Sequence, residues 1–265
     1  MKQPLLILSS RASFNRHQEC VDYAKKNDYQ GIEWYLDYYR LPAGKKSRED
    51  FFAALRNSAL LHSFHGPTND ADIGQKDAAH SRAACEYQMM YIDFLSELAP
   101  LTYTIHIGGR RMPLEELSWQ HAMDNLKRVC AHGHSKGVKV CLENLVNGWV
   151  GDPEKLMEMV TASGAGITFD IGHARGGQWV REGQGTALEF LNIVAPKVVN
   201  AHVYEYENEK GEHLAPANTT EISPILARLL EIGCRWWVLE LNAYAETENT
   251  RRIVNDHMNP RGGRA

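Results

Sequence analysis

The chain of 265 residues is 43% hydrophobic and 23% charged, so it can bury a sizeable core and cannot be largely disordered. Its 29 basic and 33 acidic residues give a net charge of −4, which argues against a protein whose main task is to bind nucleic acid, because such proteins usually carry a basic excess. No apolar run approaches the roughly 20 residues that a membrane-spanning helix needs, and five scattered cysteines without a C-x-x-C pair predict a reduced, cytoplasmic protein.

Eight short apolar runs recur along the whole chain, and each is followed by a polar or glycine-containing corner. The runs are rich in Val, Ile, Leu and aromatic residues without strict alternation, a composition typical of strands that are buried on both faces. In chain order they cover residues 5–9, 31–34, 60–65, 103–108, 138–143, 166–170, 198–202 and 236–241.

Longer amphipathic stretches separate these runs and predict helices. Residues 75–99 and 115–134 each carry an apolar stripe, while Asp-Pro (152–153) and Ser-Pro (223–224) resemble an N-cap followed by Pro at the first helical position. Eight strands that alternate with helices over about 250 residues predict an α/β fold, a single-domain (β/α)8 TIM barrel. An open doubly wound sheet is the alternative, but no G-x-G-x-x-G follows the first strand. We expect the barrel to occupy residues 1–258 and residues 259–265 to form a flexible C-terminal tail.

A carboxylate or a histidine stands at the C-terminal end of nearly every predicted strand. The strand ends and the loops that follow them converge on one rim of a parallel barrel, so we expect these side chains to assemble at one mouth. They are Glu33, His65, His106, Glu143, Asp170 with His173, His202 and Glu240.

So many potential ligands at one mouth would repel one another without a cation, and a divalent metal ion removes that penalty. Mixed histidine and carboxylate ligation favours zinc, manganese, cobalt or iron, whereas magnesium and calcium prefer oxygen ligands. The four residues that we expect to hold the metal are Glu143, Asp170, His202 and Glu240. His65 and His106 are candidates for additional ligands, and His173 is predicted to contact substrate or to bind a further ion. For Glu33, a structural and a functional role both stay open.

In their order and spacing, the motifs resemble those of the xylose isomerase-like TIM barrels, a group that includes the endonuclease IV-like enzymes of AP endonuclease family 2. The resemblance covers residues 5–242, nearly the whole chain. The matching segments are GIEW (31–34), HGP (65–67), TIHIGG (104–109), LEN (142–144), FDIGH (169–173), NAH (200–202) and LELN (239–242).

The resemblance implies a metal-dependent isomerase or epimerase that acts on a small sugar, sugar phosphate or polyol. In such members, one metal is held by residues that match Glu143, Asp170, His202 and Glu240. Glu143 and Glu240 would also be catalytic. One removes a proton from a carbon next to a carbonyl and the other returns it, through an enediolate that the metal stabilises. His173 and His65 would be substrate contacts.

The endonuclease IV-like members imply the alternative function, a multi-zinc phosphoester hydrolase. The positions that match its second and third metal sites are His65, His106 and Glu143, and His173 and His213, respectively. The third site also has an Asp two residues before the second histidine, where this chain has Gly211, and we weigh Glu212 or Glu205 as substitutes. This departure and the acidic net charge count against the hydrolase.

Two loops carry further candidates. GGRR (108–111) follows the fourth strand as an anion-binding corner in which Arg110 would bind substrate, although an ordinary solvated loop accounts for it equally well. The loop at 35–46, rich in tyrosine and basic residues, is interpreted as a lid or a subunit interface rather than a nucleic-acid contact. A non-catalytic barrel would be expected to have lost metal ligands, and the four principal ones are intact. The expected partner is a small carbohydrate, without nucleic acid or membrane, and related barrels suggest a homo-oligomer.

Overall fold

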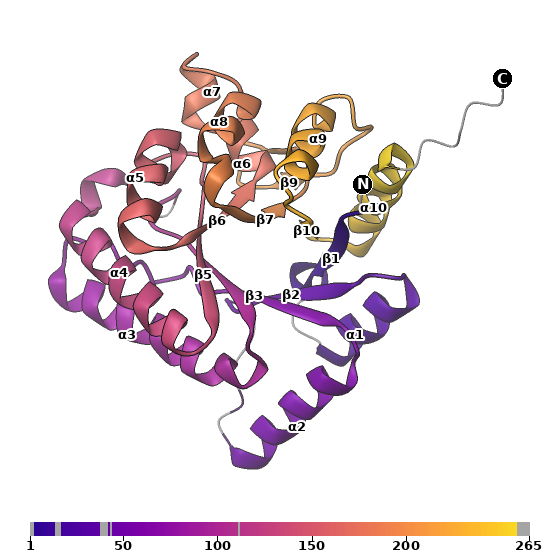
Figure 1. The fold of residues 1–265 in the computed structure, drawn as a ribbon, viewed down its shortest axis with the longest axis horizontal. Helices are drawn as coiled ribbons and strands as arrows, with labels where there is room; N and C mark the ends of the chain where they lie inside the picture. The colour runs from indigo at the N-terminus through magenta and orange to yellow at the C-terminus, as the bar shows by residue number, and fades with distance from the viewer. Residues whose placement is uncertain (1–2, 14–16, 38–41, 43, 111, 259–265) are drawn as a thin grey trace.

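Eight parallel strands close into a barrel in the computed structural model, which describes residues 3–13, 17–37, 42, 44–110 and 112–258 (Figure 1). Neighbouring strands follow the order β1-β10-β7-β6-β5-β4-β3-β2, and β1 pairs with β10 to complete the circle. The predicted (β/α)8 barrel is therefore confirmed, and the tail at 259–265 lies outside the described residues. The barrel strands are β1 Leu5–Ser9, β2 Gly31–Tyr35, β3 Leu61–His65, β4 Leu101–Ile105, β5 Val138–Glu143, β6 Gly166–Asp170, β7 Val198–His202 and β10 Trp236–Leu239.

Helices surround the barrel and bury their apolar stripes against it (Figure 1). They are α1 His17–Lys26, α2 Lys45–Asn57, α3 Ala78–Leu95, α4 Trp119–Ser135, α5 Pro153–Ser163, α6 Ile171–Gly176, α7 Gln178–Arg181, α8 Ala187–Val194, α9 Ser223–Glu231 and α10 Tyr244–Met258. The first and last helices meet where the ring closes, because Tyr23 of α1 stacks on Tyr244 of α10 with ring centroids 3.8 Å apart. No helix of the described residues is long and apolar enough to cross a lipid bilayer.

Helix starts follow the predicted capping chemistry at one site and differ at the other. Oδ1 of Asp152 accepts hydrogen bonds from the backbone N–H groups of Glu154 and Lys155, with Pro153 in the first turn, as predicted. The α9 N-cap is Ile222 rather than Ser223. The preceding turn, in which the N–H of Ser223 donates to the carbonyl of Thr219, moves the helix start forward by one residue.

Strand β4 also differs from its prediction, since it covers Leu101–Ile105 rather than residues 103–108. It begins next to Val138 of β5, with which Leu101 pairs. The chain leaves the sheet before Gly108 and Gly109, whose φ angles of 78° and 108° are incompatible with a strand. His106 therefore lies just beyond the strand, at the start of a loop over the barrel mouth.

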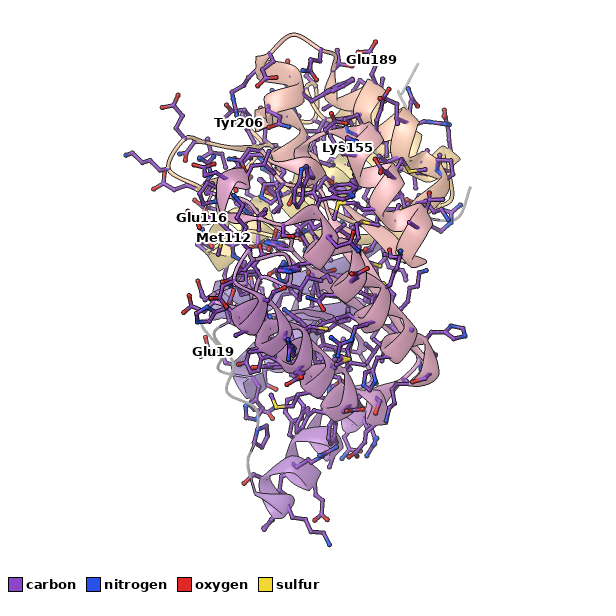
Figure 2. All side chains as sticks on the ribbon, turned by 90° about the vertical axis from the view of Figure 1, so that its left-hand side faces the viewer. Glu19, Met112, Glu116, Lys155, Glu189 and Tyr206 are labelled. Carbon is purple, nitrogen blue, oxygen red and sulfur yellow. The ribbon has the colours of Figure 1, made fainter. Side chains whose placement is uncertain are left out.

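After β7, a short hairpin interrupts the regular alternation of barrel strands and helices. Strands β8 (Tyr206–Glu207) and β9 (His213–Leu214) pair antiparallel, so that Glu207 lies directly opposite His213. In the side view of Figure 2, Tyr206 of this hairpin and Met112 of the loop after β4 lie along the same edge of the molecule. Arg110 of the loop after β4 donates to the carbonyls of Asn208 and Glu209 between β8 and β9, so loops that follow different strands meet on this side of the barrel.

Candidate metal centre and active site

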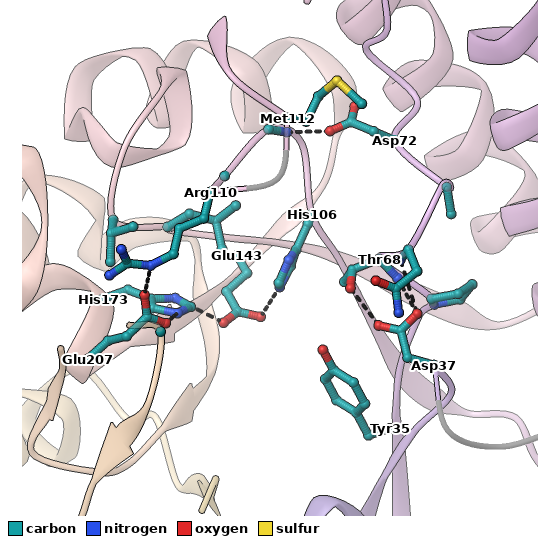
Figure 3. A pocket seen from close by; sticks show the side chains of 18 of the residues that line it. Tyr35, Asp37, Thr68, Asp72, His106, Arg110, Met112, Glu143, His173 and Glu207 are labelled. Carbon is teal, nitrogen blue, oxygen red and sulfur yellow. Dashed lines mark hydrogen bonds and ion pairs between the residues drawn. The ribbon is translucent and has the colours of Figure 1, made fainter. Parts of the chain in front are cut away.

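A pocket of about 390 Å³ opens at the C-terminal mouth of the barrel (Figure 3). Of the predicted residues, those that line it are His106, Arg110, Glu143, His173, His213 and Glu240. His65, Asp170 and His202 are buried behind these side chains. The structure thus brings the strand-end residues together at one rim, as the sequence predicts.

The central cluster consists of Glu143, Asp170, His202 and Glu240, which come from four adjacent strands or their ends. Nδ1 of His202 lies 3.0 Å from Oε2 of Glu240, 3.2 Å from Oε1 of Glu143 and 3.5 Å from Oδ2 of Asp170. All four side chains are at most 2% exposed. One nitrogen and three carboxylates therefore face a common point.

The central cluster fits a divalent cation. Oδ2 of Asp170 and Oε2 of Glu240 are buried and accept no hydrogen bond from the described residues, an arrangement that is costly unless a positive ligand is present. One candidate ligand atom from each of the four residues lies within 4.8 Å of all the others. Three carboxylates and one imidazole suit zinc, manganese or cobalt.

Neighbouring charged groups shift the pKa values of Glu143, Glu240 and His202. Burial alone would raise the pKa of Glu143, but the adjacent rings of His202 and His106 hold that pKa well below its usual range. Burial likewise opposes the charged form of Glu240, yet His202 and the guanidinium of Arg11 lower its pKa. The surrounding carboxylates raise the pKa of His202 against the effect of its burial. Glu143 and Glu240 are thus stabilised in their charged forms at this centre.

The outer cluster consists of His65, His106 and Glu143, and Glu143 contributes its second carboxylate oxygen to it. Oε2 of this residue lies 3.1 Å from Nε2 of His65 and 3.0 Å from Nε2 of His106. Nδ1 of His65 donates to the carbonyl of Gly66 at 2.9 Å, which turns Nε2 toward the cluster. Figure 3 shows Glu143 between His106 on one side and His173 on the other. The outer cluster is a second candidate metal site.

A third cluster joins His173 and His213 through Glu207, a residue that the sequence analysis missed. Oε2 of Glu207 lies 2.9 Å from Nε2 of His173 and 3.5 Å from Nε2 of His213. The two substitutes proposed from sequence were wrong. The carboxylate of Glu205 faces Arg175 at 3.7 Å, and the exposed Glu212 accepts a hydrogen bond from Asn208. Hairpin pairing, which sets residue 207 opposite 213, is the signal that could have identified Glu207.

Arg110 contacts the hairpin rather than open solvent. Its Nε donates to Oε1 of Glu207 at 2.5 Å, and its two terminal nitrogens donate to the carbonyls of Asn208 and Glu209. The guanidinium predicted to bind substrate is therefore engaged within the protein in this structure. Arg111, the other arginine of that corner, lies outside the described residues.

We expect Arg110→Met to increase amide hydrogen exchange by about tenfold in residues 205–214, because hydrogen bonds from a charged group each contribute about 1.5 kcal/mol or more. Exchange would be followed by mass spectrometry. The matched control is Arg56→Met, since Arg56 also donates to a backbone carbonyl, that of Glu97, and contacts no residue of the hairpin within the described part of the chain. If amide exchange in the hairpin is unchanged in the Arg110 variant, Arg110 does not stabilise the hairpin.

Arg11 is a second pocket residue that the sequence analysis did not identify. It follows β1, and its Nη1 lies 3.1 Å from Oε1 of Glu240 with its guanidinium 5.1 Å from the ring centroid of Tyr35. Tyr35 itself lines the pocket, whereas residues 38–41 and 43 of the predicted lid lie outside the described residues. Nothing in the apolar run 5–9 signals an arginine directed into the mouth.

The model of one protein family, described as the xylose isomerase-like TIM barrel, matches residues 21–258. The chain belongs to this family. Two curated relatives from Methanocaldococcus jannaschii are both uncharacterized proteins: MJ0008, 34% identical over 155 residues (58% of this chain), and MJ1311, 31% identical over 116 residues (41% of this chain). The matches span 66% and 38% of the lengths of these two relatives.

Solved structures similar to this xylose isomerase-like barrel include several proteins named as sugar epimerases. A D-tagatose 3-epimerase-like protein shares 18% identity with a TM-score of 0.79, over 96% of this chain and 97% of the other. An L-ribulose 3-epimerase shares 14% identity with a TM-score of 0.73, over 98% and 95%. The 3-keto-D-glucoside 4-epimerase of E. coli shares 14% identity with a TM-score of 0.71, over 97% and 99%. At these identities, the similarity establishes the fold.

Proposed function

We propose that the protein is a metal-dependent isomerase or epimerase of a small sugar, sugar phosphate or polyol. The observation that carries the proposal is the pairing of Glu143 and Glu240, two carboxylates that line the same pocket and also contact the same nitrogen of His202. Such an arrangement can hold a substrate carbon between two groups that accept or donate protons. The sugar epimerases of the same fold support this choice of substrate class.

In the proposed mechanism, Glu143, Asp170, His202 and Glu240 would hold a divalent ion, for which zinc, manganese or cobalt is favoured over magnesium. When bound, this ion polarises the substrate carbonyl and offsets the negative charge that develops beside it. One glutamate removes the proton from the carbon next to the carbonyl. The other glutamate returns a proton to the neighbouring atom or to the opposite face.

Other pocket residues would orient the substrate. His173 is a candidate to contact a substrate hydroxyl, since it lines the pocket and its Nδ1 is held by the carbonyl of Asn144 at 2.9 Å. His65 stands behind Glu143 and would position that carboxylate or approach the substrate beside it. Tyr35 packs beside His65, with ring centroids 4.5 Å apart, and covers that wall of the pocket. These contacts keep the reacting carbon close to the two glutamates.

The second candidate function is a multi-zinc phosphoester hydrolase. It gains support from the third cluster, in which Glu207 replaces the missing Asp beside His213. Clustered metals suit in-line attack on phosphorus. Against it, the guanidinium of Arg110 already neutralises Glu207, so the third cluster has less need of an ion. We therefore rank the hydrolase second.

Two measurements distinguish the isomerase or epimerase from the hydrolase: the number of metal ions bound per chain, and the exchange of substrate protons with solvent. We expect about one tightly held metal per chain after purification without chelator, measured by elemental analysis. With manganese or cobalt, we expect deuterium from D₂O to enter ketoses at the carbon next to the carbonyl, followed by NMR. Two or three zinc ions per chain, with hydrolysis of phosphodiesters and no exchange, would support the second function. Absence of metal even after incubation with excess zinc and manganese would exclude both.

We also propose that the protein works in a reducing compartment, the cytoplasm. All five cysteines are buried as free thiols, and disulfides are uncommon in such compartments. The acidic net charge argues against nucleic acid as a partner. A homo-oligomer stays a prediction.

A further inference from the structure

Glu33 lies beneath the central cluster, and its role was left open by the sequence. Its side chain projects from β2 into the barrel and is 1% exposed. Oε1 lies 2.9 Å from Nε2 of His202, and Oε2 accepts a hydrogen bond from the hydroxyl of Ser63 at 3.0 Å. Each oxygen of this carboxylate therefore has its own neighbour.

The two nitrogens of His202 face opposite ways. Nδ1 points to the carboxylates of the central cluster, with Glu240 at 3.0 Å, whereas Nε2 faces Glu33. Among the described residues, Nε2 forms no hydrogen bond of standard geometry, and the carboxylate of Glu33 is the group placed within 3 Å of it. Glu33 is thus the group that can accept the Nε2 proton and leave the lone pair of Nδ1 directed toward the centre.

Ser63 and Trp236 hold the carboxylate of Glu33 in place. The indole Nε1 of Trp236 donates to the hydroxyl oxygen of Ser63 at 3.2 Å, and Ser63 donates in turn to Glu33. Because the hydroxyl of Ser63 accepts from one side and donates to the other, its orientation is determined. The chain of contacts runs across the barrel from β10 through β3 and β2 to β7.

Glu33 is neither a ligand nor a substrate contact in this arrangement. Its oxygens do not belong to the group of candidate ligand atoms that lie within 4.8 Å of one another. The residue also does not line the pocket at the barrel mouth. Its effect must therefore pass through the imidazole of His202.

We propose that Glu33 is a positioning residue for the metal centre, which fixes the ring orientation and tautomer of His202 so that Nδ1 binds the ion. This inference rests on the proposed function, because it needs an ion in the central cluster. A carboxylate on the far nitrogen of a metal-binding histidine orients the ring and makes it a stronger ligand, and loss of such a partner typically weakens metal binding by about 10- to 100-fold.

The test measures the affinity of Co²⁺ by competition with a chromophoric chelator. Asp170→Asn identifies the ion of the central cluster, since Asp170 belongs to that cluster alone among the three. We expect Glu33→Gln to weaken this binding by about 10- to 100-fold. The matched control is Asp152→Asn, since this half-buried carboxylate caps α5 and does not line the pocket, and Asn can keep the cap. It should bind Co²⁺ as the wild type does.

A second variant and a spectroscopic readout keep the test decisive if Glu33→Gln folds poorly. Ser63→Ala keeps the charge of Glu33 but removes its hydrogen-bond donor, so we expect a smaller loss of affinity in the same direction. In zinc-loaded protein with ¹⁵N-labelled histidine, we expect the Nε2–H resonance of His202 to shift when Glu33 is replaced. Unchanged affinity and unchanged resonance in Glu33→Gln would overturn this inference alone. Failure of the wild type to bind Co²⁺ would overturn it together with the proposed function.

Discussion

Replacing Glu240 or Glu143 by Gln is expected to reduce kcat by about 10³-fold at saturating metal, because proton transfer by a positioned side chain contributes about 10²- to 10⁴-fold. Gln keeps the shape of Glu but cannot take up or release a proton at neutral pH. Both carboxylates belong to the buried charge network of the central cluster, so the substitution removes one negative charge without leaving a cavity. The fold, followed by circular dichroism and thermal unfolding, should be retained.

Proton exchange sharpens this test beyond a loss of rate. If the two glutamates act on opposite faces of the carbon, each variant should still exchange the proton of one epimer with solvent while failing to interconvert the two. Glu86→Gln, on the exposed side of α3, controls for the change of charge and should retain full activity. Turnover at the wild-type rate in either Glu143→Gln or Glu240→Gln would exclude that residue from proton transfer.

Divalent metal is expected to raise the melting temperature of the wild type by about 5–10 °C when its concentration is 100 times the dissociation constant. Ligand linkage at that concentration contributes about 2.7 kcal/mol, and a protein of this size gains roughly 2–4 °C per kcal/mol. The physical cause is relief of the repulsion among three buried carboxylates, two of which have an oxygen without a hydrogen-bond partner. Differential scanning calorimetry with cobalt, and then with added chelator, measures the rise and its reversal.

Asp170→Asn is the matched variant for this second experiment. The carboxylate of Asp170 caps α6 by accepting from the N–H of His173 at 2.7 Å, and Asn caps helices equally well. The variant should therefore fold, lose the metal-dependent rise, and be at least as stable as the wild type without metal. An equal rise in Asp170→Asn would show that the ion binds outside the central cluster.

The sequence predicts the barrel and most of its mouth because each buried parallel strand appears as an apolar run that stops at a polar residue. Glu143, Asp170 and His202 are the last residues of β5, β6 and β7, so locating the strand also locates the ligand. His106 is an exception to this relation between strand ends and ligands, because it lies beyond the end of β4. The strand ends one residue earlier, yet the loop still carries His106 to the carboxylate of Glu143.

Residues outside the strands escaped prediction for physical reasons. Glu207 reaches His173 only because an antiparallel hairpin turns the chain back on itself, and a search at fixed spacing before His213 cannot detect that pairing. Arg11 lies in a short 3-10 helix after β1, where its direction depends on the tertiary contact with Glu240. Loop conformation is determined by such contacts rather than by local periodicity.

The hairpin β8–β9 has an evolutionary consequence. It contributes both Glu207 and His213, yet none of its residues takes part in the hydrogen-bonded ring of the barrel. Insertions and substitutions in this short excursion can therefore create, remodel or abolish an ion-binding position while the scaffold is left untouched. Sequence changes confined to this hairpin would let proteins descended from one ancestral barrel catalyse reactions that need different numbers of cations.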